Sequence, residues 1–337
     1  MAWDLIGHQW AIDLLRRHIS EEQVRHAYLF TGPEGIGKRT LGLRLAQALD
    51  CESPPSAGDF CGRCRACRLI PQETYPDLHV VRPADAGGTL KVEEVRQLQH
   101  QLALSTFEGR WRIALLPRFQ QATVSAANAM LKTLEEPSPQ VVLLLTSTSK
   151  EALLPTIVSR CEVMPLRALA VGDLERSLAA LFGDEAKARL LARLSGGRPG
   201  KALQLATDEA LMKSRGEWID GLLVLLGQSR TERFRYAEKL TQERDEEGRR
   251  VRIRQTLDTW SSLWRDALLM AYGAEAASVN PDRPEEVARL AHEFSPDVLD
   301  AALRATERTR QAIQEYANLR LALENLMLDL PRWKSGN

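Results

Sequence analysis

Two short segments of the chain carry side chains whose types and spacing suit chemistry. The first is Gly32–Lys38, in which three glycines precede a lysine. Glycines let a backbone curl so that its N–H groups point at phosphate oxygens, and the lysine adds a charge for the outer phosphates. The second holds four of the five cysteines, at Cys51, Cys61, Cys64 and Cys67. These segments predict a phosphate-binding loop and a metal site.

The phosphate-binding interpretation of Gly32–Lys38 depends on its flanks. The apolar run Ala27–Phe30 before it has the pattern of a buried strand, and Leu41, Leu45 and Leu49 after it lie on one face of a predicted helix. Strand, glycine loop and helix in this order are typical of a P-loop fold, whose helix N-terminus adds positive potential. A glycine-rich turn with a chance lysine is the alternative, and the order of the elements argues against it.

The loop lacks the groups that hold magnesium in an ATPase. The residue after the lysine should be a serine or threonine whose hydroxyl binds Mg²⁺, and here it is Arg39. Thr40 comes one place later, and a helical step of about 100° turns its side chain away from the phosphates. The strand expected to carry the metal-binding acid, Arg112–Leu116, runs into Pro117 and Arg118, which neither bind Mg²⁺ nor activate water. We therefore expect no hydrolysis by this chain alone, and the sequence leaves open whether the loop is empty or holds ATP or ADP. The residues of this degenerate nucleotide site are Gly32, Gly35, Gly37, Lys38, Arg39 and Thr40.

The clustered cysteines have the spacing C-x9-C-x2-C-x2-C. Thiolates two residues apart on a tight turn can bind one ion, and a fourth sulfur from a nearby helix end completes a tetrahedron. The segment from Cys61 to Cys67 is polar and loop-like, whereas unrelated free cysteines prefer core positions. We predict a structural Zn²⁺ site with no open coordination position. Cys161 stands alone beside an apolar strand, and we expect a buried small side chain rather than a nucleophile.

Charge and hydropathy narrow the class of protein. Acidic and basic side chains number 45 each, so no net field draws the chain onto DNA or a membrane surface. Contact with nucleic acid must then come from a local patch or from partner subunits. No apolar run is long enough to cross a membrane, and the N-terminus lacks a signal-peptide pattern, so we expect a cytoplasmic protein. In a reducing cytoplasm, crowded cysteines favour a metal over disulfides.

The elements that must position these groups form three predicted parts. In the first half, short apolar runs alternate with helical patterns, which is typical of an α/β module with a parallel sheet flanked by helices. Beyond it, strand signals stop and Ala/Leu stripes predict only helices. The predicted parts are 1–167, a P-loop module with a zinc insert at 51–67; 168–207, a small helical domain; and 208–337, a larger all-α domain. The predicted strands are Ala27–Phe30, Leu78–Val81, Arg112–Leu116, Val141–Thr146 and a short one at Cys161–Met164.

Several motifs, in this order, resemble the bacterial clamp-loader ATPase family of AAA+ proteins. They are Ile6–Gln9, His26–Phe30, the cysteine insert after the P-loop helix, Asn128–Pro137 and Ser159–Cys161. The Leu-Lys-Thr-Leu-Glu-Glu-Pro run followed by Ser-Arg-Cys is highly specific to this family, while the phosphate loop alone is not. The resemblance is close over about the first 165 residues and extends to the helical remainder in layout only.

The resemblance implies an AAA+ P-loop module with its zinc insert, a helical lid, and an all-α collar through which subunits assemble a hetero-oligomeric ring. Active gamma/tau-type members carry an Asp-Glu pair where this chain has Pro117 and Arg118, a metal-binding hydroxyl at Arg39, and a nucleotide-sensing lid arginine near Gly200. These departures favour the degenerate delta-prime type. Its implied partners are gamma/tau and delta subunits, with the sliding clamp and primed DNA reached through the complex. It would be a component of the DNA polymerase III holoenzyme, a nucleotidyltransferase, without ATPase activity of its own.

The resemblance also implies a role for Arg160. In this family the Ser-Arg-Cys arginine projects into the ATP site of a neighbouring subunit, where it acts as an arginine finger in trans. From the residue alone, an ordinary surface salt bridge would be the expected role. Glu135 and Glu136 end a helix where its dipole disfavours acids. This could indicate a partner or a cation nearby, but we expect a solvated helix end rather than an active-site pair. Thr146 and Ser147 lie where family members place a γ-phosphate sensor, and without metal ligands we assign them no role.

Two other functions remain open from the sequence. An active gamma/tau-type clamp-loader ATPase would use non-standard ligands, and its turnover would be abolished by Lys38→Ala. A zinc-dependent nucleic-acid-binding module would contact phosphates through Arg63, Arg65 and Arg68 near the cysteines. Its DNA binding would have a steep salt dependence and be lost on charge reversal of those arginines.

Overall fold

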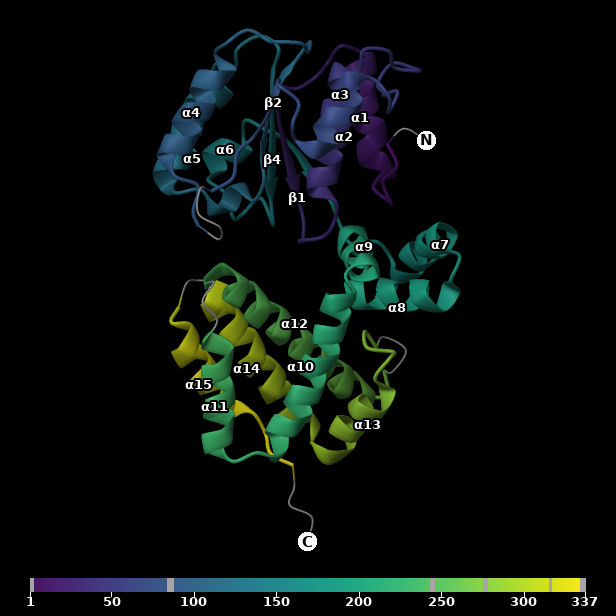
Figure 1. Ribbon diagram of the computed structural model, residues 1–337, viewed down its shortest axis with the longest axis vertical. Coiled ribbons are helices and arrows are strands. Elements are labelled where there is room, and N and C mark those ends of the chain that lie inside the picture. The colour runs from purple at the N-terminus through teal and green to yellow at the C-terminus, as the bar shows by residue number, and fades with distance from the viewer. Residues whose placement is uncertain (1–2, 84–87, 243–245, 275–277, 315–316, 334–337) are drawn as a thin grey trace. The chain divides into compact units, whose positions relative to one another are not determined.

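The computed structural model describes residues 3–83, 88–242, 246–274, 278–314 and 317–333. The chain divides into two compact units (Figure 1). The first comprises Met1–Ser177 with Gly197–Lys201, and the second comprises Leu178–Gly196 with Ala202–Asn337. The predicted lid at 168–207 is divided between these units, so the three-part division stays a prediction.

A parallel sheet forms the centre of the first unit, as predicted. Its strand order is β2-β3-β4-β1-β5, and every neighbouring pair is parallel. Strands β1, β3 and β4 are buried along their whole length, which explains why they read as continuous apolar runs rather than alternating ones. The strands are β1 Ala27–Thr31, β2 Leu78–Val80, β3 Arg112–Leu116, β4 Val141–Ser147 and β5 Glu162–Pro165.

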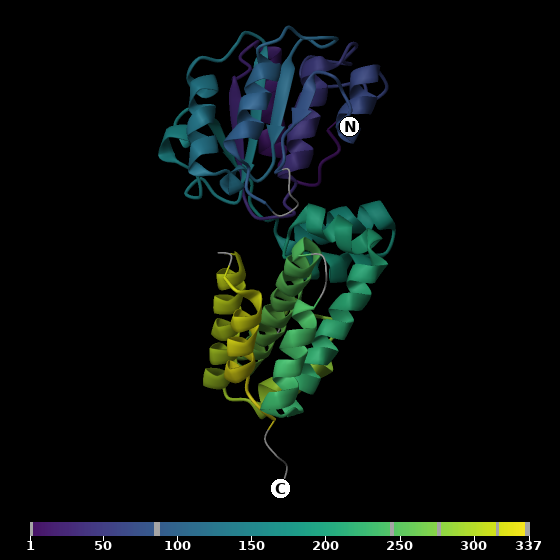
Figure 2. The same cartoon turned by 60° about the vertical axis from the view of Figure 1, so that its left-hand side comes forward.

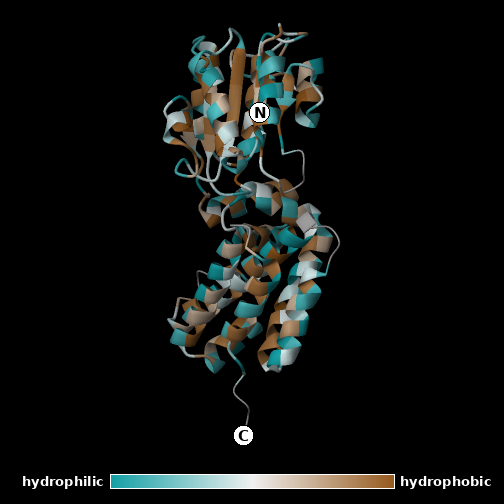
Figure 3. Cartoon of the chain, turned by 90° about the vertical axis from the view of Figure 1, so that its left-hand side faces the viewer, coloured by the Kyte–Doolittle hydropathy of each residue, from teal (hydrophilic) through white to brown (hydrophobic). Residues whose placement is uncertain are grey.

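Helices cover both faces of this sheet (Figures 1 and 2). Successive strand residues face opposite sides, so Tyr28 and Phe30 pack in the core with α1 and α2, whereas Ala27 and Leu29 pack with α4 and α5. Figure 3 shows hydrophobic strands between helices of mixed hydropathy. The α/β prediction is confirmed. The helical elements are α1 Gln9–Ser20, α2 Lys38–Asp50, α3 Arg65–Leu69, η1 Ile70–Gln72, α4 Val92–Leu102, η2 Phe119–Gln121, α5 Val124–Glu135 and α6 Pro155–Val158.

All regular elements among the described residues of the second unit are helices, which confirms the predicted change after the sheet. Trp260 and Trp264 of α12 lie at its centre, fully buried, and α12 packs against α10, α13 and α14. Helices α7 and α9 each contribute residues to both units. None of the helices in the described ranges is long and apolar enough to cross a membrane. The remaining helices are α7 Val171–Phe182, α8 Glu185–Ser195, α9 Pro199–Thr207, α10 Glu209–Gly227, α11 Arg230–Thr241, α12 Glu246–Ala271, α13 Pro284–Glu293, α14 Pro296–Gln314 and α15 Leu319–Asp329.

A buried arginine joins two helix ends in this second unit. The guanidinium of Arg233, in α11, donates to the carbonyls of Leu225 and Leu226 at the end of α10 and to those of Met327 and Leu330 at the end of α15. The last carbonyls of a helix have no intrahelical partner and carry partial negative charge. Arg233 is 2% exposed, so these carbonyls serve as its counter-charge.

Candidate functional sites

The glycine loop lies between β1 and α2, as predicted. β1 has β4 on one side and β5 on the other, and the loop follows its carboxyl end, where open parallel sheets bind ligands. The backbone φ angles of Gly32, Gly35 and Gly37 are 141°, 76° and 105°. Residues other than glycine rarely adopt such values. Lys38 is the first residue of α2. The local backbone is therefore that of a phosphate loop.

Within this loop, the ammonium of Lys38 donates to the loop's own carbonyls. It contacts the carbonyl oxygen of Gly32 and lies 2.8 Å from that of Pro33. Burial lowers the pKa of Lys38 to about 8. The lysine therefore turns back onto the loop in this structure.

The arginine that replaces the magnesium-binding hydroxyl is held by an acid. Arg39 lies 2.6 Å from the carboxylate of Glu73, and Arg82 binds the same carboxylate at 2.7 Å. Burial alone would raise the pKa of Glu73, but the two guanidinium groups hold it below its usual range. Thr40 is exposed. The position that should bind Mg²⁺ thus carries a cation with a partner of its own.

The end of β3 offers no metal-binding acid. Arg118 adopts a left-handed conformation with φ 53°, and its backbone N–H donates to Oγ1 of Thr146 at 2.9 Å. The hydroxyl of Ser147 donates to the carbonyl of Ser149 at 2.7 Å. The hydroxyls at the end of β4 are therefore engaged in local hydrogen bonds.

The start of α9 lies against the glycine loop, within the same unit. The N–H of Lys201 donates to the carbonyl of Gly35 at 3.2 Å. A Cβ added at Gly200 would lie 2.9 Å from that carbonyl oxygen, which is closer than real Cβ atoms come. The close contact leaves no room for any residue larger than glycine at position 200.

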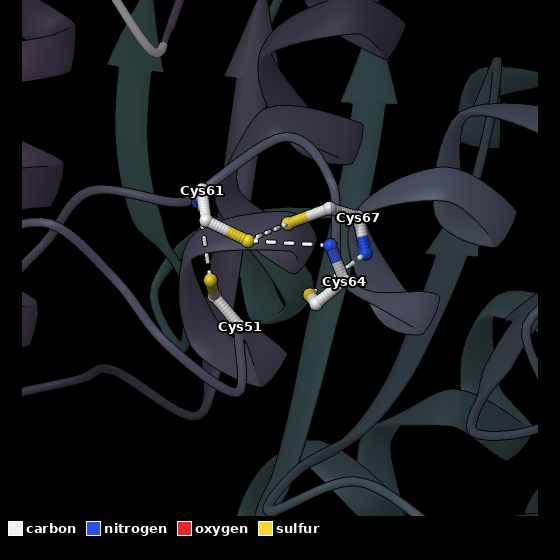
Figure 4. A group of neighbouring side chains, drawn as sticks. All are labelled: Cys51, Cys61, Cys64 and Cys67. Carbon is white, nitrogen blue, oxygen red and sulfur yellow. Dashed lines mark hydrogen bonds between the residues drawn. The ribbon is translucent and has the colours of Figure 1, made fainter.

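The four clustered cysteines come together, as predicted (Figure 4). Cys51 caps the C-terminus of α2 and Cys64 caps the N-terminus of α3, so two helix ends and the loop between them supply the sulfurs. The four Sγ atoms lie within 4.8 Å of one another, and those of Cys61 and Cys67 are 4.0 Å apart. Tetrahedral zinc with Zn–S bonds of about 2.3 Å needs sulfurs about 3.8 Å apart. The donor set therefore fits one tetrahedral metal ion.

Backbone amides around the cluster favour thiolates. N–H groups of Cys61 and Cys64 donate to the sulfurs of Cys51 and Cys61 at 3.2 and 3.3 Å. Hydrogen bonds from the backbone of Arg63 and Cys64 lower the pKa of Cys61 to about 6, whereas burial raises that of Cys67. A thiolate that accepts amide hydrogen bonds is prepared to bind a cation before the cation arrives.

The cluster and the glycine loop lie at opposite ends of α2. This helix has 13 residues, so its ends are about 20 Å apart. The cysteines therefore lie too far from the glycine loop to bind the same phosphate. Of the three arginines near the cluster, Arg65 is paired with Glu108 at 2.9 Å.

Two buried carboxylates that bind the segment before β3 were not predicted from the sequence. Asp77 accepts hydrogen bonds from the backbone N–H groups of residues 107, 108 and 109, and Asp50 accepts from those of 110 and 111. Asp77 is 0% exposed and Asp50 4%. They fix the loop that enters β3. An acid at the end of an apolar helix and another just before a short strand are the only signals in the sequence.

The predicted finger residue Arg160 lies just after α6. Its Nη2 is 2.7 Å from Oε1 of Glu135, the last residue of α5. Glu135 thus has a cationic partner, whereas the expectation from the sequence was a solvated helix end. Cys161 is partly buried against the apolar cluster beside α5, and burial raises the pKa of its thiol to about 12, which disfavours a nucleophile.

The fold and the loop define the class: an AAA+ module, with a P-loop between strands of a parallel sheet, followed by helices. A family model described as "DNA polymerase III, delta subunit" matches residues 7–170, and one described as "DNA polymerase III, delta subunit, C terminal" matches residues 209–332. The chain belongs to this family of DNA polymerase III subunits.

Individual relatives agree with this assignment. The chain is 41% identical over 210 residues to DNA polymerase III subunit delta' of Pseudomonas aeruginosa, over 61% of this chain and 63% of that protein. It is 27% identical to subunit delta' of Bacillus subtilis over 94% of both chains. The match with subunit tau of Escherichia coli, 34% identical, covers 64% of this chain but 33% of that protein. The matched part of the chain therefore spans less than two thirds of the length of the Pseudomonas aeruginosa and Escherichia coli proteins.

A solved structure supports the fold alone. The gamma subunit-related protein of Thermotoga maritima has a TM-score of 0.51 and 18% identity, over 94% of this chain and 97% of that one. Together with the family models, this likeness confirms the predicted AAA+ architecture.

Proposed function

We propose that this chain is a delta-prime-type subunit of a bacterial replicative clamp loader. It joins gamma/tau-type and delta-type subunits in a hetero-oligomeric ring that loads the sliding clamp onto primed DNA. It hydrolyses no ATP itself and supplies Arg160 to the ATP site of a neighbouring subunit. The relatives named delta' support the assignment, and the P-loop geometry supports the absence of hydrolysis.

The observation that carries the proposal is the state of the magnesium positions. Arg39, which takes the place of the hydroxyl ligand, is paired with Glu73, and β3 ends in Pro117 and Arg118 instead of acids. ATP hydrolysis in P-loop proteins needs Mg²⁺ to neutralise charge between the phosphates. A loop that keeps its glycines but loses both metal ligands suits a structural member of the ring.

Arg160 supplies the remaining chemistry. A guanidinium inserted from a neighbouring subunit stabilises charge on the transferring phosphoryl group, and such arginines raise rates by about 10³–10⁵. Arg160 lies at the surface, with 35% of its side chain exposed, as a residue that acts in trans requires.

For the cysteine cluster we propose Zn²⁺ as the metal, because four sulfurs at tetrahedral spacing suit it and leave no open position. Cys51, Cys61, Cys64 and Cys67 would hold the ion and tie α2 to α3. The ion supplies stability there and no reaction chemistry.

Two assays test the function. The purified chain alone should show no ATP turnover above that of its Lys38→Ala variant. Mixed with gamma/tau-type and delta-type subunits, it should support ATP hydrolysis that falls at least tenfold with Arg160→Ala, toward the loss expected of a finger arginine. Turnover by the isolated chain that disappears with Lys38→Ala would instead support the gamma/tau-type ATPase.

The nucleic-acid-binding alternative gains little from the structure. Arg65 is committed to Glu108, which reduces the charge available for phosphates beside the cysteines. Salt-dependent DNA binding by the chain alone, lost on charge reversal of Arg63, Arg65 and Arg68, would revive it.

A further inference from the structure

We propose that Glu135 is a positioning residue for Arg160, holding its guanidinium in one orientation for the neighbouring ATP site. This inference rests on the proposed function, because the orientation of Arg160 matters only if it acts on a neighbour.

Contacts from two elements fix the guanidinium plane. Nη2 of Arg160 lies 2.7 Å from Oε1 of Glu135, at the end of α5. Nη1 donates to the carbonyl of Thr156 in α6 at 2.9 Å and to Oγ of Ser159 at 3.3 Å. Since the two terminal nitrogens are held by different elements, rotation of the planar group is restricted.

These contacts leave donors for a substrate. A guanidinium has five N–H donors, and the three contacts above leave the one on Nε and one of the two on Nη2 for a phosphoryl oxygen. The carboxylate of Glu135 thus aligns one edge of the group while the other edge can meet the phosphate.

Stability does not explain the placement of Glu135. It is the last residue of α5, where the helix dipole disfavours an acid. The side chains of Arg160 and Glu135 are 35% and 50% exposed, and ion pairs of this exposure contribute little to stability. Because the ion pair adds little stability, we assign Glu135 the role of orienting Arg160.

The adjacent acid, Glu136, provides a matched control. It is also exposed, and it forms no ion pair with any residue in the described ranges. Glu135→Gln and Glu136→Gln each remove one charge from the same helix end, but only the first removes the carboxylate that contacts Arg160.

The test uses reconstituted complexes with gamma/tau-type and delta-type subunits, in which kcat and KM for ATP are measured. Glu135→Gln should lower kcat on the order of tenfold with KM nearly unchanged, because misplaced catalytic groups lose rate rather than substrate binding. Glu136→Gln should match the wild type. The double variant Glu135→Gln, Arg160→Ala should be no slower than Arg160→Ala alone, since Glu135 acts through Arg160.

The outcomes separate this inference from the proposed function. Wild-type kcat for Glu135→Gln, with a slow Arg160→Ala, overturns the role of Glu135 and leaves the finger intact. Losses that multiply in the double variant also overturn it, because they mean independent actions. An unchanged rate for Arg160→Ala overturns the finger itself and the role of Glu135 with it. Thermal unfolding of each variant, expected to match the wild type, shows that folding is not the cause.

Discussion

The carbonyl oxygen of Gly35 in the phosphate loop and the α-carbon of Gly200 at the start of α9 approach so closely that no side chain fits between them. A Cβ at position 200 would lie 2.9 Å from that oxygen, and a Cβ at position 35 would lie 2.9 Å from the Cβ of Lys201. The loop and the helix start are therefore packed backbone to backbone. A larger residue on either side would separate them.

Gly200→Ala should destabilise the chain, although alanine normally favours a helix over glycine. The added methyl group must push α9 away from the loop, at a cost of about 1–3 kcal/mol, measured by urea unfolding. Gly172 is the matched control. It is also the second residue of a helix, α7, and an added Cβ there meets nothing within 4 Å. Gly172→Ala should be neutral or stabilising, and equal effects of the two substitutions would contradict the contact.

Removal of the metal should unfold the region around the cysteines. We expect one Zn²⁺ per chain by elemental analysis, and Cys64→Ser should abolish it and cost several kcal/mol in the free energy of unfolding. The ligands must be deprotonated to bind, so acidification should release the ion. Cys161→Ala should leave the zinc content at one, because this thiol lies outside the cluster. Full zinc content in Cys64→Ser would argue against the site.

Asp77 should give the chain an acid-sensitive stability. Burial alone would raise its pKa, but three backbone N–H groups and Arg112 hold the pKa below the usual aspartate value. A carboxylate with a lowered folded pKa stabilises the fold above its unfolded pKa of about 3.9, and this stability is lost as the pH falls through the folded pKa.

Asp77→Asn should therefore lose about 2–4 kcal/mol at neutral pH and depend less on pH below about 4 than the wild type. Urea unfolding at several pH values measures both effects. Glu108→Gln, which alters a partly exposed acid on the same loop, should change stability by under about 1 kcal/mol. A pH profile of Asp77→Asn parallel to the wild type would show that Asp77 does not carry the acid response.

Arg233→Met should destabilise the second unit by about 3–5 kcal/mol, because the buried carbonyls at the end of α15 lose their guanidinium donor. The carbonyls of Leu225 and Leu226 at the end of α10 also lose this donor but keep a backbone N–H each. Arg233→Lys should recover only part of this loss, since an ammonium cannot reach both helix ends with the geometry of a guanidinium. Arg235, exposed on the same helix, is the control, and Arg235→Met should be nearly neutral. Calorimetric unfolding compares the three.

Local patterns in the sequence were sufficient to predict the sheet and the clustered cysteines. Strands such as Val141–Ser147 are continuous apolar runs because both faces are buried, and the cysteines lie within one short segment. The pairing of Glu135 with Arg160 was not predicted, because the two residues are 25 positions apart and an acid at a helix end is usually solvated. Asp50 and Asp77 were missed because most of their partners are backbone amides, which leave no mark in the amino-acid sequence, and because Arg112, the side-chain partner of Asp77, is 35 positions away. The contact of Gly35 with Gly200 depends on tertiary packing that no local pattern encodes.

Helix α2 begins at the phosphate loop and ends at Asp50, directly before Cys51, a metal-ligand candidate. A helix is stiff along its axis, so fixing its far end limits how much its first turn can tilt. Removal of the metal by a chelator should therefore increase amide hydrogen exchange at Gly37 and Lys38, although these residues lie one helix length away from the ion. The zinc insert would thus restrict the motion of the phosphate loop through α2, without contacting the loop.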